Sequence, residues 1–213
     1  MNKKKLIIFD FDGTIADTLC LGYEIYQDLA ENYHFRQIDR SEINNLRDLS
    51  TYEILRKMKI SLIKVPFLAV QFQRELNKRI EELHPINGMI EILKQIDISK
   101  VKLGIITSNS KENVEKFLQN YDIKNLFSFI HSEKNIFGKT HILKKTFREQ
   151  NYLPSNVFYV GDETRDIDSS KKAHIPVIAV GWGFNSKSAL LKHNPDYFTA
   201  SPEELLSQIN SLI

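Results

Sequence analysis

Short runs of mostly apolar residues recur along the chain and alternate with segments whose apolar residues return every three or four positions. Five such runs are rich in β-branched and aromatic residues, and they lie at 6–9, 101–107, 127–131, 157–160 and 177–180. Strands that are apolar along their length are typical of a parallel sheet that helices cover on both faces. The pattern therefore predicts an α/β protein in which right-handed helical crossovers join the strands.

Helix start signals support this interpretation. Ser201 stands before Pro202, and a glutamate follows at the third helical position, which predicts a helix that runs to Leu212. Ser110 is placed to cap a helix over 111–121, where apolar residues have helical spacing.

The segment 18–83 breaks the alternation of strands and helices. It contains no strand-like run, and helical spacing recurs in it, as in 66–83. We therefore predict that 18–83 is a helical lobe inserted after the first strand, and that 1–17 together with 84–213 form the α/β core.

Composition narrows the class of protein. The chain has 213 residues, of which 42% are hydrophobic and 26% charged, as in ordinary globular proteins. Its 29 basic and 27 acidic residues are dispersed, so we expect no nucleic-acid partner. The single cysteine, Cys20, excludes an internal disulfide framework and a cysteine-based metal site. The first apolar run ends at Asp10, too early for a signal peptide or membrane span, so we expect a complete cytoplasmic protein without a membrane partner.

Polar residues stand where the predicted strands end and where a helix over 140–150 begins. They are Asp10, Asp12, Thr107, Ser108, Asn109, Lys139, Asp162 and Asp166. Each alone has an ordinary explanation as a helix cap, a turn residue or a solvated lysine. Because ligands of parallel α/β sheets bind at the carboxyl ends of the strands, near a switch in strand order, we expect these residues to gather there.

The four aspartates of this set pose a charge problem. Crowded at one sheet edge, they would raise each other's pKa unless cations lie among them. Oxygen ligands without histidine or cysteine suit a hard divalent cation, so we expect Mg²⁺ as the cofactor. Lys139 adds a second cation, and the segment 107–109 adds donors for an anion. Such a site can bind or transfer a phosphoryl group.

These residues resemble the motifs of a known family. The stretch from Asp10 to Asp17, DFDGTIAD, resembles the first motif, DxDGTLxD, of the haloacid dehalogenase-like phosphohydrolases. Thr107-Ser108-Asn109 is similar to the second motif, Lys139 to the third, and Gly161-Asp162 with Asp166 to the fourth. Ile15 replaces the usual Leu, and the Pro that often follows the lysine is missing, so the lysines that compete with Lys139 are Lys134, Lys144 and Lys145.

The resemblance implies a Rossmann-like core with a helical cap of the C1 type, and it implies roles for the aspartates. Asp10 would be the nucleophile that forms an aspartyl-phosphate, and Asp12 would be the general acid and base. The side chain of Asp10, the main-chain carbonyl of Asp12 and the side chain of Asp162 would hold Mg²⁺. Asp166 would bind the ion through water or support its ligands.

The remaining motif residues would act on the phosphate. By the same resemblance, Thr107 and Lys139 would hold the transferring phosphoryl oxygens and offset their charge, with Ser108 and Asn109 beside them. The aspartate two residues after the nucleophile resembles that of phosphatases and phosphomutases, both of which need an acid and base there.

The cap and the tail at 180–185 are similar to the phosphoglycolate phosphatase-like branch, so the expected activity is Mg²⁺-dependent hydrolysis of a small phosphomonoester. Core packing at the end of a strand is an equally good explanation of the Gly-Trp-Gly turn in this tail. A β-phosphoglucomutase-like phosphomutase is the alternative. A receiver-type binding module that holds phospho-Asp10 is a third, although such a module needs neither Asp12 nor a cap.

The cap would contact the leaving group, so substrate specificity would depend on it. A loop between cap helices is expected at 46–51, and Arg47 is its candidate contact with an anionic substrate. The alternative for Arg47 is a solvated side chain paired with Asp48 or Glu53. The expected partner is a small phosphorylated metabolite, and the sequence is compatible with a monomer or a homodimer.

Overall fold

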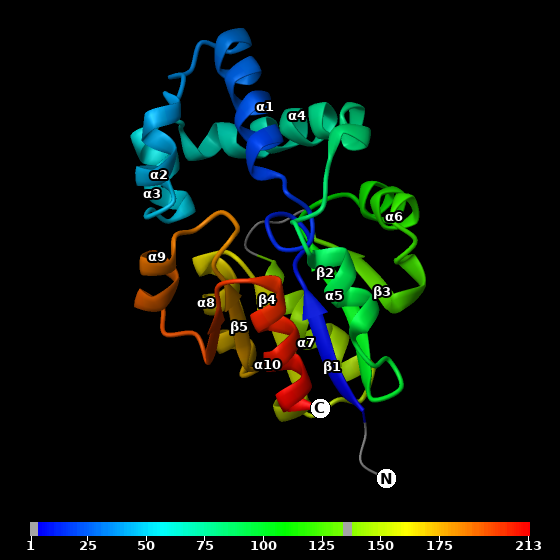
Figure 1. Cartoon of the computed structure of the whole chain (residues 1–213). Coiled ribbons are helices and arrows are strands. Elements are labelled where there is room, and N and C mark those ends of the chain that lie inside the picture. Colours follow the sequence, from blue (N-terminus) through cyan, green and yellow to red (C-terminus); the bar gives the residue numbers. More distant parts are fainter. Residues whose placement is uncertain (1–3, 134–137) are drawn as a thin grey trace.

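Six parallel strands form one sheet in the computed structural model, which describes residues 4–133 and 138–213 (Figure 1). Their order is β3-β2-β1-β4-β5-β6. The strands are β1 Lys5–Phe9, β2 Val101–Thr107, β3 Phe127–Ser132, β4 Val157–Gly161, β5 Val177–Val180 and β6 Tyr197–Thr199. The predicted parallel α/β fold is thus confirmed. The three-residue strand β6 escaped prediction because it is too short to carry a pattern.

The central strand explains why the runs are apolar throughout. Ile7 and Phe9 pack into the hydrophobic cluster on one face of the sheet, and Leu6 and Ile8 pack into the cluster on the other. Side chains of a strand alternate between faces, so a strand that is covered on both sides has no position for a polar residue until it ends.

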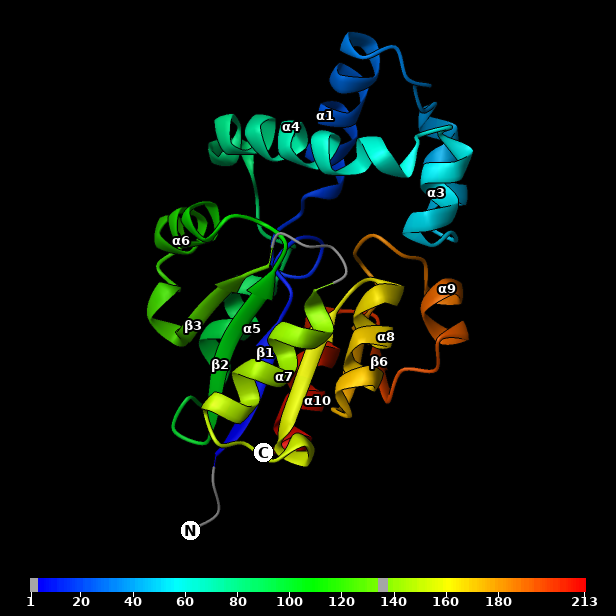
Figure 2. The same cartoon turned by 180° about the vertical axis from the view of Figure 1, so that it is seen from behind.

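Helices cover both faces of the sheet. Figure 1 shows α5 (Met89–Gln95) and α10 (Pro202–Leu212) on the front face of the sheet, one on either side of β1, and Figure 2 shows α7 (Lys139–Glu149) and α8 (Thr164–Ala173) over the opposite face. The remaining core helices are α6 (Lys111–Asn120), α9 (Lys187–Lys192) and the 3₁₀ turns η4 (Lys124–Leu126) and η5 (Pro154–Asn156). Ser201 and Ser110 accept the predicted capping bonds from the N–H groups of Glu204 and Asn113.

The segment 18–83 is helical and lies beyond the carboxyl ends of the strands (Figures 1 and 2). Its elements are α1 (Leu19–Asn32), η1 (Arg40–Glu42), α2 (Ile43–Leu46), α3 (Thr51–Lys57), η2 (Leu62–Lys64), α4 (Val65–Lys78) and η3 (Ile80–Glu82). A small cluster of its own contains Ile38, Leu46, Met58 and Ile60. The helix predicted over 66–83 ends at Lys78, because Arg79 departs from helical geometry with φ −108°. In the part of the chain that the structure describes, no helix combines the length and apolar character needed to cross a membrane.

The strand order fixes where a ligand site can form. From β1 the chain moves outward to β2 and β3, and it then returns to β4 on the other side of β1. The crossovers after β1 and β4 therefore diverge, which leaves a crevice at the carboxyl ends of these two strands. Asp10 and Asp12 follow β1, and Asp162 follows β4, so the sheet brings the predicted carboxylates to this crevice.

Candidate active site

Asp10 is the first residue after β1 and is 2% exposed. Its Oδ1 accepts a hydrogen bond from the N–H of Phe11 at 2.8 Å, and its Oδ2 accepts one from Nζ of Lys139 at 2.7 Å. Both oxygens are therefore held in place. Burial raises the pKa of the Asp10 carboxyl, and the nearby Lys139 opposes this shift.

Lys139 is the lysine that the fold delivers to the site. It begins α7, is 5% exposed, and also donates to Oδ1 of Asp166 at 2.5 Å. Burial alone would lower the pKa of the ammonium, but attraction by Asp10 and Asp166 outweighs it, and the pKa lies well above its usual value. Of its predicted competitors, Lys144 and Lys145 lie further along α7 without a described ion pair to a site carboxylate, and Lys134 lies outside the described residues.

Three carboxylates form a compact group. Ligand oxygens of Asp10, Asp162 and Asp166 lie within 4.8 Å of one another, and all three residues are buried. Burial raises the pKa of Asp162 well above its ordinary value, and repulsion by neighbouring acidic groups adds to the shift. Lys139 carries one positive charge against three carboxylates, and the nearby Arg165 is paired with Glu163, so negative charge remains in the desolvated site. An all-oxygen donor set suits a hard divalent cation. The residues present therefore fit a bound divalent cation.

The side chain of Asp12 does not join this group, which corrects the expectation that four carboxylates crowd together. Its Oδ1 accepts from Nδ2 of Asn109 at 3.0 Å, and its Oδ2 lies 3.4 Å from Oγ1 of Thr107. These donors are neutral, and no lysine within residues 4–133 and 138–213 bonds to the carboxyl. Burial raises the pKa of Asp12 to about 6, and the hydrogen bond from Asn109 opposes the shift.

The turn after β2 shapes this environment. Thr107 and Asn109 are buried, Ser108 lies partly buried between them, and the N–H of Asn109 donates to Oγ1 of Thr107 at 3.0 Å. Ser132 at the end of β3 donates to the carbonyl of Asn109 at 2.6 Å. The predicted phosphate-binding segment is therefore at the site, and two of its side chains contact Asp12.

Asp162 sits in a space that glycine provides. Its Oδ1 accepts from Oγ1 of Thr14 at 2.8 Å, and its Oδ2 accepts from the N–H of Phe184 at 2.7 Å. Gly13 has φ +72°, and a Cβ on it would lie 2.2 Å from Oδ2 of Asp162. Only glycine meets both requirements, so the first motif turns sharply and makes room for the fourth.

Arg165 is a charged neighbour that sequence reasoning missed. Its Nη2 donates to Oε1 of Glu163 at 2.6 Å, while its Nε is buried without a hydrogen-bond partner among the described residues. Its positive charge opposes the burial-driven rise in the pKa values of Asp10 and Asp12. The available signal was an arginine inside the fourth motif, one residue before Asp166.

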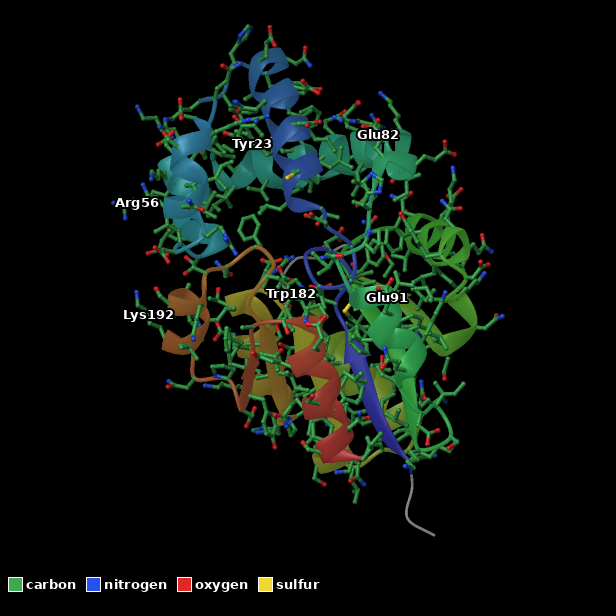
Figure 3. The ribbon with its side chains drawn as sticks, in the orientation of Figure 1. Tyr23, Arg56, Glu82, Glu91, Trp182 and Lys192 are labelled. Atoms are coloured by element: carbon green, nitrogen blue, oxygen red, sulfur yellow. The ribbon has the colours of Figure 1, made fainter. Side chains whose placement is uncertain are left out.

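The loop between β5 and α9 contacts both the core and the helical segment. Trp182 lies where the two meet (Figure 3), and its Nε1 donates to the carbonyl of Thr14 at 3.2 Å. Asn185, 2% exposed, accepts from the N–H of Thr164 at 2.9 Å and donates to the carbonyl of Leu49 at 3.1 Å. This loop, which the sequence marked only as a family-like tail, therefore borders the site.

Arg47 lies in the predicted loop between helices, here between α2 and α3. Its guanidinium donates to the carbonyls of Gly183 and Phe184. The alternative in which Arg47 pairs with Asp48 or Glu53 is wrong, because the described side-chain partners of Asp48 and Glu53 are serine hydroxyls. Contact between Arg47 and a substrate stays a prediction.

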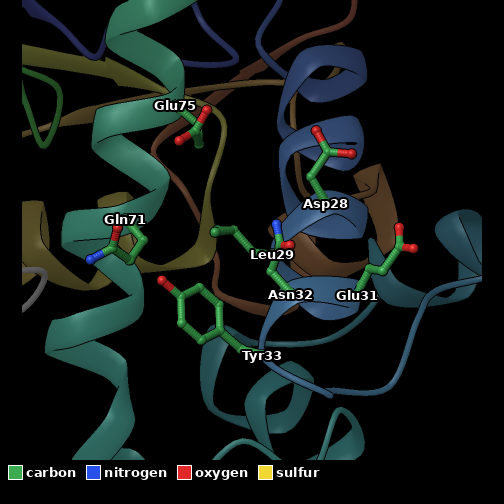
Figure 4. Close-up of a pocket in the computed structure, with 7 residues that line it drawn as sticks. All are labelled: Asp28, Leu29, Glu31, Asn32, Tyr33, Gln71 and Glu75. Atoms are coloured by element: carbon green, nitrogen blue, oxygen red, sulfur yellow. The ribbon is translucent and has the colours of Figure 1, made fainter.

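A separate hollow of about 500 Å³ lies between α1 and α4. Figure 4 shows Tyr33 reaching between the two helices, with Asp28, Glu31 and Glu75 around the hollow. These acidic residues belong to the helical segment and none of the motifs reaches them. The hollow therefore supports no assignment, and the chemistry is concentrated at the ends of β1, β2 and β4.

Comparison with known proteins agrees with this geometry. Residues 7–180 match the model of a family described as haloacid dehalogenase-like hydrolase. The chain is 33% identical over 207 residues to a phosphoglycolate phosphatase of Synechococcus elongatus, covering 97% of the chain and 98% of that protein. It is 24% identical over 216 residues to the pyrophosphatase PpaX of Bacillus mycoides, covering 98% of the chain and 99% of the relative.

A solved structure shares the fold. A haloacid dehalogenase-like family hydrolase from Streptococcus pneumoniae superposes with a TM-score of 0.81 at 20% identity, covering 98% of this chain and all of that one. This likeness shows the fold, and the match of residues 7–180 to the family model confirms the family resemblance that the four motifs suggested.

Proposed function

Because the chain belongs to the haloacid dehalogenase-like hydrolase family, we propose that it is a Mg²⁺-dependent phosphatase that hydrolyses a small phosphomonoester through an aspartyl-phosphate on Asp10. The observation that carries the proposal is the contrast between two carboxyl groups two residues apart. Asp10 bonds to a buried lysine among other carboxylates, whereas Asp12 is held by neutral donors with a pKa of about 6. Paired carboxyl groups in different environments take different catalytic roles.

In the first half-reaction, a carboxylate oxygen of Asp10 attacks phosphorus, and the bond from phosphorus to the leaving oxygen breaks. The leaving oxygen takes the proton of Asp12, whose raised pKa allows a protonated fraction near neutral pH. Neutral hydrogen-bond donors hold the Asp12 carboxyl in place for this transfer.

In the second half-reaction, Asp12 acts as a base. It removes a proton from water, the water oxygen attacks phosphorus, and the bond between phosphorus and Asp10 breaks to release inorganic phosphate. Lys139 and Thr107 would donate to the phosphoryl oxygens, because both lie in hydrogen-bond contact with the reacting aspartates.

Asp10, Asp162 and the main-chain carbonyl of Asp12 would hold Mg²⁺, with Asp166 supporting them. A bound Mg²⁺ would offset the negative charge of the phosphoryl group and of the carboxylates around it. The hydroxyl of Thr14 and the N–H of Phe184 each donate to one oxygen of Asp162, which fixes the direction of this carboxylate for metal binding.

The segment 18–83 would serve as a cap that excludes water and contacts the leaving group. It lies beyond the carboxyl ends of β1 and β4 (Figure 1). Phosphoglycolate is the first substrate to test, because a relative that is 33% identical over nearly its whole length bears that name. A small phosphorylated metabolite is therefore the proposed partner.

The test is phosphate release from phosphoglycolate, pyrophosphate and β-glucose 1-phosphate, with Mg²⁺ and again with EDTA. We expect steady, Mg²⁺-dependent release from at least one monoester and none from the Asp10→Asn variant, which lacks the nucleophile. Conversion of β-glucose 1-phosphate without phosphate release would assign a phosphomutase instead. Activity that persists in Asp10→Asn would refute the aspartyl-phosphate mechanism.

A further inference from the structure

The helical segment 18–83 meets the core through two groups of polar contacts that lead toward the site. We name the first the Arg47 contact, formed by Arg47 with the carbonyls of Gly183 and Phe184. We name the second the Gln73 contact, formed by Gln73 of α4 with the side chain of Asn109. The core group that receives each contact also donates to a predicted catalytic or metal-binding aspartate.

In the Arg47 contact, two consecutive peptide groups lie between the guanidinium and Asp162. Nη2 of Arg47 donates to the carbonyl of Gly183 at 2.8 Å, and the N–H of the same peptide group, on Phe184, donates to Oδ2 of Asp162 at 2.7 Å. Nε of Arg47 donates to the carbonyl of Phe184 at 3.2 Å, and the N–H of that peptide, on Asn185, donates to the main-chain carbonyl of Asp162 at 3.2 Å.

In the Gln73 contact, one side-chain amide lies between the helical segment and Asp12. Nε2 of Gln73 donates to Oδ1 of Asn109 at 2.9 Å, and Nδ2 of Asn109 donates to Oδ1 of Asp12 at 3.0 Å. The orientation of this amide is fixed, because the main-chain N–H of Ser110 also donates to its Oδ1 at 2.8 Å. The amide nitrogen must therefore face Asp12.

In both contacts an amide group accepts a hydrogen bond on its carbonyl oxygen and donates one from its N–H. A donor on the carbonyl oxygen polarises the amide and strengthens the N–H on its other side, and in a buried site such chains of hydrogen bonds reinforce one another. The position of each amide also becomes fixed by the helical segment as well as by the core. A catalytic group displaced by a fraction of an ångström loses much of its effect, so this second support matters for chemistry.

We propose that Arg47 and Gln73 are positioning residues: Arg47 acts through the peptide groups of Gly183 and Phe184 to hold Asp162 for the metal, and Gln73 acts through the Asn109 amide to hold Asp12 for proton transfer. This inference rests on the roles proposed above for Asp162 and Asp12. It gives Arg47 a task other than contact with the substrate. The two contacts serve separate aspartates, so their effects on metal binding and on turnover are separable.

The Arg47 half is tested by calorimetric titration of Mg²⁺ into the metal-free full-length protein without substrate. Arg47→Met removes both donors, while the main-chain carbonyl of Arg47 still accepts from Ser186 N–H and Asn185 Nδ2, so the loop stays docked. We expect a Kd for Mg²⁺ raised about tenfold, the lower end of the effect of removing residues that support metal ligands. Arg47→Lys, which keeps the charge without the two-pronged geometry, should fall between it and wild type.

The matched control is Asp48→Ala. Asp48 adjoins Arg47 and bonds to the hydroxyls of Ser186 and Ser188, which do not donate to Asp162 in the structure. Its Kd for Mg²⁺ should stay within about twofold of wild type, since surface contacts of this kind contribute little. Equal effects in Asp48→Ala and Arg47→Met would overturn the Arg47 half. A raised KM with unchanged Mg²⁺ affinity in Arg47→Met would assign Arg47 to the substrate instead.

The Gln73 half is tested by turnover at saturating Mg²⁺. Gln73→Met keeps the length of the side chain and removes the donor, so kcat should fall about tenfold, part of the 10²–10⁴-fold that acid–base catalysis supplies. KM and Mg²⁺ affinity should not change. The control is Glu81→Gln, which removes the ion pair of 2.7 Å between Glu81 and Lys116 of α6, another contact between 18–83 and the core. Equal kcat values in the two variants would overturn the Gln73 half.

These outcomes are distinguishable from failure of the proposed function. If wild type binds Mg²⁺ but releases phosphate from no substrate, the phosphatase proposal and the Gln73 half fail, and the Arg47 half is still decided by calorimetry. If wild type binds no Mg²⁺, the Arg47 half fails together with the metal site.

Discussion

Substitution of Gly183 by alanine tests how closely the loop after β5 packs against Asp162. A Cβ at this position would lie 2.3 Å from both Cβ and Oδ2 of Asp162, whereas ordinary van der Waals contact begins at 3.4 Å. Asp162 or the loop must therefore move by about 1 Å. Such overpacking costs about 1–3 kcal/mol of stability, and a displacement of about 1 Å near reacting groups can cost about 10²-fold in rate.

The assay combines urea denaturation of the metal-free protein with Mg²⁺ titration and steady-state turnover. We expect Gly183→Ala to lose stability in that range, to bind Mg²⁺ at least about tenfold more weakly, and to turn over about 10²-fold more slowly. Gly22→Ala is the control, because its Cβ would lie 3.4 Å from Phe72 and it removes a glycine from the interior of α1. That variant should gain about 0.5–1 kcal/mol without change in activity. Normal Mg²⁺ affinity in Gly183→Ala would refute the reasoning.

Three further outcomes are expected. Asp12→Asn should slow both half-reactions by about 10²–10⁴-fold in rapid-quench measurements, because Asp12 donates a proton in the first and accepts one in the second. Rates in the variant equal to those of wild type would exclude Asp12 as the acid and base. Lys139→Met leaves Asp10 and Asp166 without the lysine that pairs with both, so urea denaturation in EDTA should show a loss of about 3–5 kcal/mol in the free energy of unfolding. Added Mg²⁺ should restore part of this loss. A denaturation midpoint equal to that of wild type would contradict this expectation. The pKa of Asp12 is about 6 in the folded protein, above the 3.8 that is usual for a solvated aspartate, so the folded state binds the proton more tightly. Its contribution to the unfolding free energy should therefore fall as pH rises from about 4 to about 6, and the pH dependence should flatten in Asp12→Asn.

Much of the site could be predicted from sequence because its residues stand next to strands. Asp10 follows a strand whose apolar residues fill both faces, and Lys139 begins a helix, so local pattern and the geometry of parallel sheets bring them together. The side-chain direction of Asp12 could not be predicted this way. It depends on Thr107 and Asn109, which lie 95 and 97 residues further along the chain. Their donors hold the carboxyl outside the group formed by Asp10, Asp162 and Asp166.

The residues that connect the helical segment to the site illustrate a different limit. Arg47 bonds to carbonyl groups 136 and 137 residues away, and Gln73 bonds to the amide of Asn109. Backbone carbonyls are present at every position, so no spacing of residue types in a sequence marks which of them an arginine will reach. An arginine in a cap loop therefore suggests a substrate anion, while the structure offers it two peptide groups that already hold Asp162. If the cap and the metal site are linked in this way, a substitution in the cap can change metal affinity without contact with either metal or substrate.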